Sequence, residues 1–164
     1  MQFYSMMVHY GEMVKMTEEQ VTKKVLEWLV GSNWEIVTYD FPQSGTGKYL
    51  HPNKEIRNRE TKNEKSFIPD IVAVRNTTAL FFENKNRFFL DDFIKLKNIK
   101  EYNIYSEDID KLLSKYHIEN VYYGIAGINS KHFIENSMQY KNDVDFIVTI
   151  EHDVSILSDR FKIF

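Results

Sequence analysis

Apolar residues that recur three or four positions apart predict the helices of this chain. Between residues 17 and 30 the apolar residues Val21 and Val25 lie four apart, as they would on one face of a helix. Thr17 is suited to begin this helix, because Gln20 stands at the second position of a capping box. Further helices are predicted over residues 90–105, at least in part, and over residues 106–116 and 131–140.

Short runs of β-branched and aromatic residues predict the strands. The first run extends from Trp34 to Phe41, and Pro42 ends it. The runs 68–74 and 79–84 are separated by a few turn-forming residues, so we expect them to pair as an antiparallel hairpin. Further strands are predicted over residues 121–128 and 145–150.

The order of these elements predicts a mixed α/β fold, with helices on both sides of one central sheet. A chain of 164 residues favours a single domain. We expect a loosely ordered lead-in over residues 1–16 and a core over residues 17–128. A C-terminal addition over residues 129–164 would supply another helix and another strand.

Composition excludes several classes of protein. The chain has no cysteine, so it has neither a disulfide framework nor a thiolate zinc site, and this fits a cytoplasmic location. No apolar run approaches the roughly 20 residues that a membrane span needs. Residues 1–16 lack the basic and apolar regions of a signal peptide. We therefore expect a protein without membrane contact.

Charge is distributed unevenly along the chain. The net charge is −3, yet the segment 48–65 holds six basic residues against three glutamates. A second segment, 85–100, holds five basic residues against two aspartates. Locally basic surfaces attract nucleic acid whatever the total charge, although solvated surface charge is an alternative explanation of either segment. The first segment lies in a polar connection, 43–66, whose length indicates either function or disorder.

Two carboxylates stand at the ends of the predicted hairpin strands. With the turn centred between Asn76 and Thr77, Asp70 lies opposite Glu83, which brings their Cβ atoms to about 5 Å. Lys85 shares a strand face with Glu83, because side chains two residues apart project to the same side. The alternative is that Glu83 and Lys85 form an exposed ion pair, which contributes only about 0–1 kcal/mol.

Carboxylates that converge in this way repel each other unless a cation lies between them. Mg²⁺ suits an oxygen-rich group of this kind, and the carbonyl of Asn84 would add a possible ligand. Glu18 lies on the inward face of the first helix and could join the group. The Lys85 ammonium could orient or deprotonate a water, or offset charge in a transition state. This chemistry fits hydrolysis of a phosphodiester.

Pro69-Asp70, twelve intervening residues and then Glu83-Asn84-Lys85 resembles the signature of the PD-(D/E)XK nuclease superfamily. That superfamily includes type II restriction endonucleases and Holliday-junction resolvases. The resemblance implies a restriction-endonuclease-like core of order αβββαβ, which residues 17–128 match. It also implies metal binding by Asp70 and Glu83 and a catalytic role for Lys85. A first-helix glutamate near the site would be Glu18, or Glu19 if the helix is rotated.

The resemblance therefore predicts a Mg²⁺-dependent endonuclease that acts on double-stranded DNA. The long polar connection favours a sequence-specific type II restriction enzyme, which would act as a homodimer because each active site cuts one strand. A Holliday-junction-resolvase-like nuclease and a non-cleaving nucleic-acid-binding protein of the same fold are the alternatives. DNA phosphates on the far side of the site would meet Lys95, Lys97 and Lys100. The main DNA-binding residues are predicted to be Lys48, Lys54, Arg57, Arg59, Lys62, Lys65 and Arg87.

Overall fold

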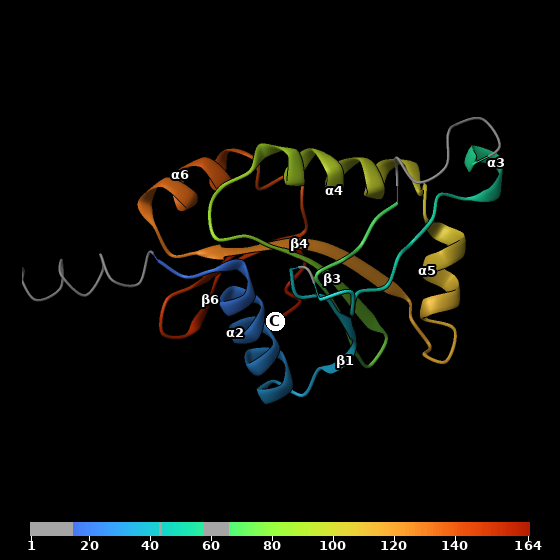
Figure 1. The fold of residues 1–164 in the computed structure, drawn as a ribbon, viewed down its shortest axis with the longest axis horizontal. Helices are drawn as coiled ribbons and strands as arrows, with labels where there is room; N and C mark the ends of the chain where they lie inside the picture. Colours follow the sequence, from blue (N-terminus) through green and yellow to red (C-terminus); the bar gives the residue numbers. More distant parts are fainter. Residues whose placement is uncertain (1–14, 43, 58–65) are drawn as a thin grey trace, which may run out of the picture.

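The structure is a computed structural model, and it describes residues 15–42, 44–57 and 66–164. In these residues the strands form one six-stranded sheet in chain order, β1-β2-β3-β4-β5-β6 (Figure 1). The strands are β1 (Glu35–Tyr39), β2 (Ile71–Arg75), β3 (Thr78–Asn84), β4 (Asn120–Ile128), β5 (Phe146–Ile150) and β6 (Val154–Asp159). The helices are α2 (Glu18–Gly31), α3 (Lys54–Arg57), α4 (Leu90–Tyr102), α5 (Ser106–Leu112) and α6 (Lys131–Gln139).

The sheet is mixed, which confirms the predicted α/β class. Strands β1, β2 and β3 pair antiparallel, β3, β4 and β5 pair parallel, and β6 returns antiparallel to β5. The parallel strands are joined by helical crossovers, as parallel pairing requires. Among the described helices, none is long and apolar enough to cross a membrane.

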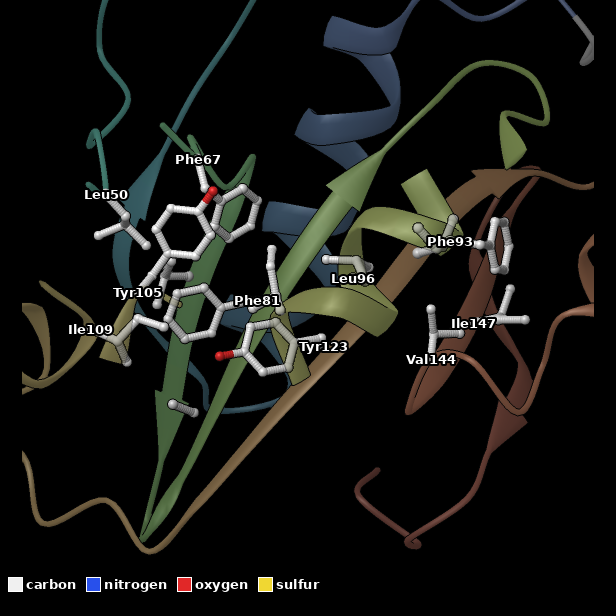
Figure 2. Close-up of a cluster of buried hydrophobic side chains, with 14 of the residues drawn as sticks. Leu50, Phe67, Phe81, Phe93, Leu96, Tyr105, Ile109, Tyr123, Val144 and Ile147 are labelled. Atoms are coloured by element: carbon white, nitrogen blue, oxygen red, sulfur yellow. The ribbon is translucent and has the colours of Figure 1, made fainter. Parts of the chain in front are cut away.

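Alternation along β3 divides the core between the two faces of the sheet. Phe82 packs on one face with Val25 of α2. Phe81 packs on the other face with Leu96 of α4. Figure 1 shows α2 on one side of the sheet and α4 and α6 on the other, and Figure 2 shows Phe81 beside Tyr123, with ring centroids 5.2 Å apart. Each face is therefore covered by its own apolar cluster.

The predicted helix start is confirmed at α2. The Oγ1 atom of Thr17 accepts a hydrogen bond from the backbone N of Gln20 at 3.2 Å, and Oε1 of Gln20 accepts one from the backbone N of Thr17 at 2.9 Å. This reciprocal pair satisfies backbone donors at the helix start and sets the helix phase. Glu18 therefore faces the sheet, while Glu19 is exposed.

The predicted hairpin and its register are confirmed. Ile71 pairs with Phe82 and Arg75 pairs with Thr78, which centres the turn between Asn76 and Thr77. Asn76 has a φ of 54°, the left-handed backbone that two-residue hairpin turns favour. The start of β2 and the end of β3 consequently lie side by side.

Three features depart from the sequence prediction. The C-terminal addition holds a helix and two strands, because residues 154–159 form β6, which was not predicted. The polar connection contains the short helix α3 and a strand-like bridge between Leu50 and Phe67. The first hairpin strand begins at Ile71 instead of residue 68, since Pro69 has no N–H to donate to a ladder. The predicted order αβββαβ therefore holds with the unpredicted helix α3 inserted, and the helix predicted over residues 106–116 is present as the shorter α5.

Candidate active site

The two carboxylates predicted from the hairpin lie at one end of the sheet. Asp70 directly precedes β2, and its backbone N donates to the carbonyl of Phe82 at 3.0 Å. Its Oδ2 atom accepts a hydrogen bond from the backbone N of Asn84 at 2.6 Å. Glu83 lies on the neighbouring strand and is only 3% exposed. The backbone thus holds the Asp70 carboxyl group in place before any ligand binds, and strand pairing fixes the position of Glu83 beside it.

Burial and repulsion from neighbouring carboxylates disfavour charge on both groups. Burial is the main cause that raises the pKa of Asp70 to about 6, and Glu18 raises it further, although the Asn84 hydrogen bond and Lys85 oppose this. Burial also raises the pKa of Glu83 to about 8, followed by repulsion from Asp70, while Lys95 lowers it. A positive charge placed between Asp70 and Glu83 would favour the ionised form of both carboxyl groups and so lower the pKa of each.

Helix α4 supplies a lysine that sequence reasoning had assigned elsewhere. The Nζ atom of Lys95 lies 3.0 Å from Oε1 of Glu83 and 3.6 Å from Oδ1 of Asp92. Lys95 was expected to contact DNA phosphates on the far side, and the structure instead places it among the carboxylates. Its companions Lys97 and Lys100 pair with Asp143 at 3.8 Å and with Asp145 at 2.6 Å.

Lys85 lies just beyond β3 and contacts a different part of the cluster. Its Nζ atom is 3.7 Å from Oε1 of Glu18 and 3.9 Å from Oδ2 of Asp92. The predicted inward face of Glu18 is therefore correct. Glu19 points away and pairs with Lys23 at 3.4 Å, so it does not replace Glu18.

Asn84 points to the opposite face of the sheet from Glu83. Its Nδ2 atom donates to Oγ1 of Thr22 in α2 at 3.1 Å. The Asn84 side chain therefore does not join the carboxylates, and its contribution is the backbone N–H that binds Asp70. A metal-ligand role for its main-chain carbonyl stays a prediction.

The carboxylates of the site are the oxygen ligands that a hard divalent cation prefers. Among the described residues, no group of three or more His, Cys, Asp or Glu side chains is arranged to hold a metal ion. Mg²⁺, however, is commonly bound by one or two carboxylates, with water and substrate phosphates completing its shell. The buried Oε1 atom of Glu83 has the Nζ atom of Lys95 as its ion-pair partner at 3.0 Å. Asp70 and Glu83 therefore fit Mg²⁺ that binds together with a phosphate substrate.

The structure describes the side chains of three of the predicted DNA-binding residues, Arg87, Lys48 and Lys54. Arg87 lies beside the site, exposed, with its guanidinium 4.6 Å from the ring centre of Phe89. Lys48 is exposed and lines a hollow of about 460 Å³ with His51 and Lys111. Lys54 is exposed on α3. The side chain of Arg57 and the whole of Arg59, Lys62 and Lys65 lie outside the described residues.

The sequence analysis did not predict that Asp92 and Lys95 belong to this site. A signal was present, because Asp92 lies four residues before Leu96 and seven before Ile99, on the apolar stripe of α4. A carboxylate on such a stripe is expected to be buried and therefore paired.

Comparisons with protein-family models, with curated proteins and with solved structures found no match to this chain. The candidate site thus rests on its own geometry.

Proposed function

We propose that this protein is a Mg²⁺-dependent DNA endonuclease of the PD-(D/E)XK type, most like a small type II restriction enzyme. The observation that carries the proposal is the position of Asp70 and Glu83 at the adjoining ends of β2 and β3, where burial raises the pKa of each carboxyl group. Perturbed carboxylates of this kind gather at functional sites. Ordinary surface ion pairs would not require such burial.

Asp70 and Glu83 would hold the cation, which would neutralise phosphate charge and lower the pKa of a bound water. The Lys85 ammonium lies close enough to lower the pKa of Asp70. It would stabilise negative charge that develops on the scissile phosphate. Glu18 orients Lys85 through their contact of 3.7 Å.

Double-stranded DNA is the proposed substrate, and a homodimer in the cytoplasm is the proposed state. Arg87 would bind a phosphate next to the site, since it is exposed beside Lys85 and Phe89. Lys48 and Lys54 belong to the connection between β1 and β2, and would contact the backbone farther away. Such contacts position the duplex, while base contacts would decide the sequence that is cut.

The proposal is tested by incubating plasmid DNA with the protein in Mg²⁺ and in EDTA. Discrete fragments in Mg²⁺ alone are expected. Asp70→Asn should lower the rate at least about a hundredfold, because a metal ligand is lost. Asp91→Asn is the matched control, since Asp91 is exposed and should leave the rate unchanged.

Other outcomes separate the alternatives. Cleavage restricted to four-way junctions would replace the restriction-enzyme proposal with a resolvase. Binding of DNA without cleavage of any substrate would reject an enzymatic function. Equal activity of Asp70→Asn and the wild type would show that the proposed site is wrong.

A further inference from the structure

Asp92 connects the two lysines of the candidate site. It lies in the first turn of α4 and is 8% exposed. Its Oδ1 atom is 3.6 Å from Nζ of Lys95, and its Oδ2 atom is 3.9 Å from Nζ of Lys85. One carboxylate thus faces two ammonium groups that come from different elements.

The burial of this carboxylate is costly to the folded protein. A buried charge is stabilised only when good partners replace the water that it loses. The Oδ2 atom of Asp92 is buried and has no hydrogen-bond partner, while its ion pair with Lys85 is long. Asp92 also raises the pKa of Glu83 through repulsion. Stability alone would favour an apolar residue at this position, as at Phe93 and Leu96 on the same helix.

We propose that Asp92 is a positioning residue, which holds the ammonium groups of Lys85 and Lys95 beside the Asp70–Glu83 pair. Without Asp92, the remaining contact of Lys85 would draw it toward Glu18, and that of Lys95 would draw it toward Glu83. With Asp92 the two ammonium groups are held against the same carboxylate, so a phosphate that reaches one would be close to the other. The effect of Asp92 on catalysis rests on the proposed nuclease function. Its effect on the positions of Lys85 and Lys95 is independent of that function.

A helix-start role is the simpler explanation of Asp92, because carboxylates in the first turn interact favourably with the helix dipole. Asp91 occupies the same turn but is exposed, so it provides the matched comparison. If the dipole were the whole explanation, Asp91→Asn and Asp92→Asn would have similar effects. Positioning predicts effects on Lys85 and Lys95 that are specific to Asp92.

The experiment measures how fast each lysine is reductively methylated in wild type, Asp92→Asn and Asp91→Asn, with sites read by mass spectrometry. Methylation requires an accessible, neutral amine, which an ion pair disfavours. In Asp92→Asn the rates at Lys85 and Lys95 should rise several-fold. Lys97 lies on the same helix and pairs with Asp143, so its rate should stay unchanged. Asp91→Asn should leave all three rates unchanged.

Cleavage kinetics follow on the same variants. Asp92→Asn should lower kcat at least about tenfold, as loss of an orienting partner does, with little change in KM. Unchanged rates at Lys85 and Lys95, or an equal rise at Lys97, would overturn the proposal, because α4 would be unaffected or merely loosened. If the lysine rates respond but the wild type cuts no DNA, the positioning role stands and the nuclease function fails.

Discussion

Helix α4 forms two ion pairs with buried carboxylates, and the two pairs are built differently. Near its C-terminal end, Lys100 lies 2.6 Å from Oδ1 of Asp145, whose Oδ2 atom also accepts a hydrogen bond from the backbone N of Tyr123 at 2.9 Å. Near its N-terminal end, Lys95 contacts Glu83, which is also repelled by Asp70 and Asp92. Both carboxylates are almost fully buried.

The difference separates a structural pair from a candidate site. Each oxygen of Asp145 has a partner, so its charge is compensated within the fold. The Glu83 cluster instead gathers more carboxylates than lysines, and burial together with repulsion from Asp70 and Asp92 raises the pKa of Glu83. Such an arrangement costs stability unless a carboxyl group stays protonated or another cation joins it.

The first prediction contrasts the stability of two isosteric variants at pH 8. Asp145→Asn should lower the free energy of unfolding by about 1–3 kcal/mol, because Lys100 and the backbone N of Tyr123 lose a charged acceptor. Glu83→Gln should leave the protein as stable as the wild type or more stable. Chemical denaturation measures both values. A larger loss in Glu83→Gln than in Asp145→Asn would contradict the comparison.

Sequence alone predicted the Asp70–Glu83 pair but not its surroundings. The pair follows from local rules, since a two-residue turn fixes the register and alternation fixes the faces. The apolar stripe of α4 indicates that Asp92 is buried, but the partners of Asp92 and Lys95 depend on how α4 packs over the sheet, which no local pattern encodes. For the same reason the Lys100–Asp145 pair was not foreseen. Strand β6 was missed because its apolar residues show no clear alternation.

The second prediction concerns the pH dependence of stability without added metal. Folded Glu83 keeps its proton up to about pH 8, whereas a free glutamate releases it near pH 4.5. The folded state therefore binds more protons in this window, so the free energy of unfolding falls as pH rises from about 4.5 to 8 and then levels.

Glu83→Gln lacks this titration. The stability of the variant relative to the wild type should therefore grow across the same window and stay constant above it. Thermal melts from pH 4 to 10 measure the difference. A constant difference across the whole range would show that Glu83 ionises normally in the fold.

The third and smallest prediction concerns stabilisation by a divalent cation. At pH 8, Mn²⁺ or Mg²⁺ should raise the melting temperature of the wild type, since a ligand at ten times its Kd contributes about 1.4 kcal/mol. The increase should disappear in Glu83→Gln and persist in Asp145→Asn. Equal increases in all three proteins would indicate that the cation binds elsewhere.

The central claim is that the crowded end of the sheet, and not the compensated pair at the other end of α4, performs metal-dependent DNA cleavage. The most direct measurement is the rate of plasmid cleavage in Mg²⁺ by wild type, Glu83→Gln and Asp145→Asn, each at a temperature where it is fully folded. We predict that Glu83→Gln loses at least about a hundredfold in rate and that Asp145→Asn cleaves like the wild type. Cleavage that survives in Glu83→Gln, or is lost equally in both variants, would contradict the account.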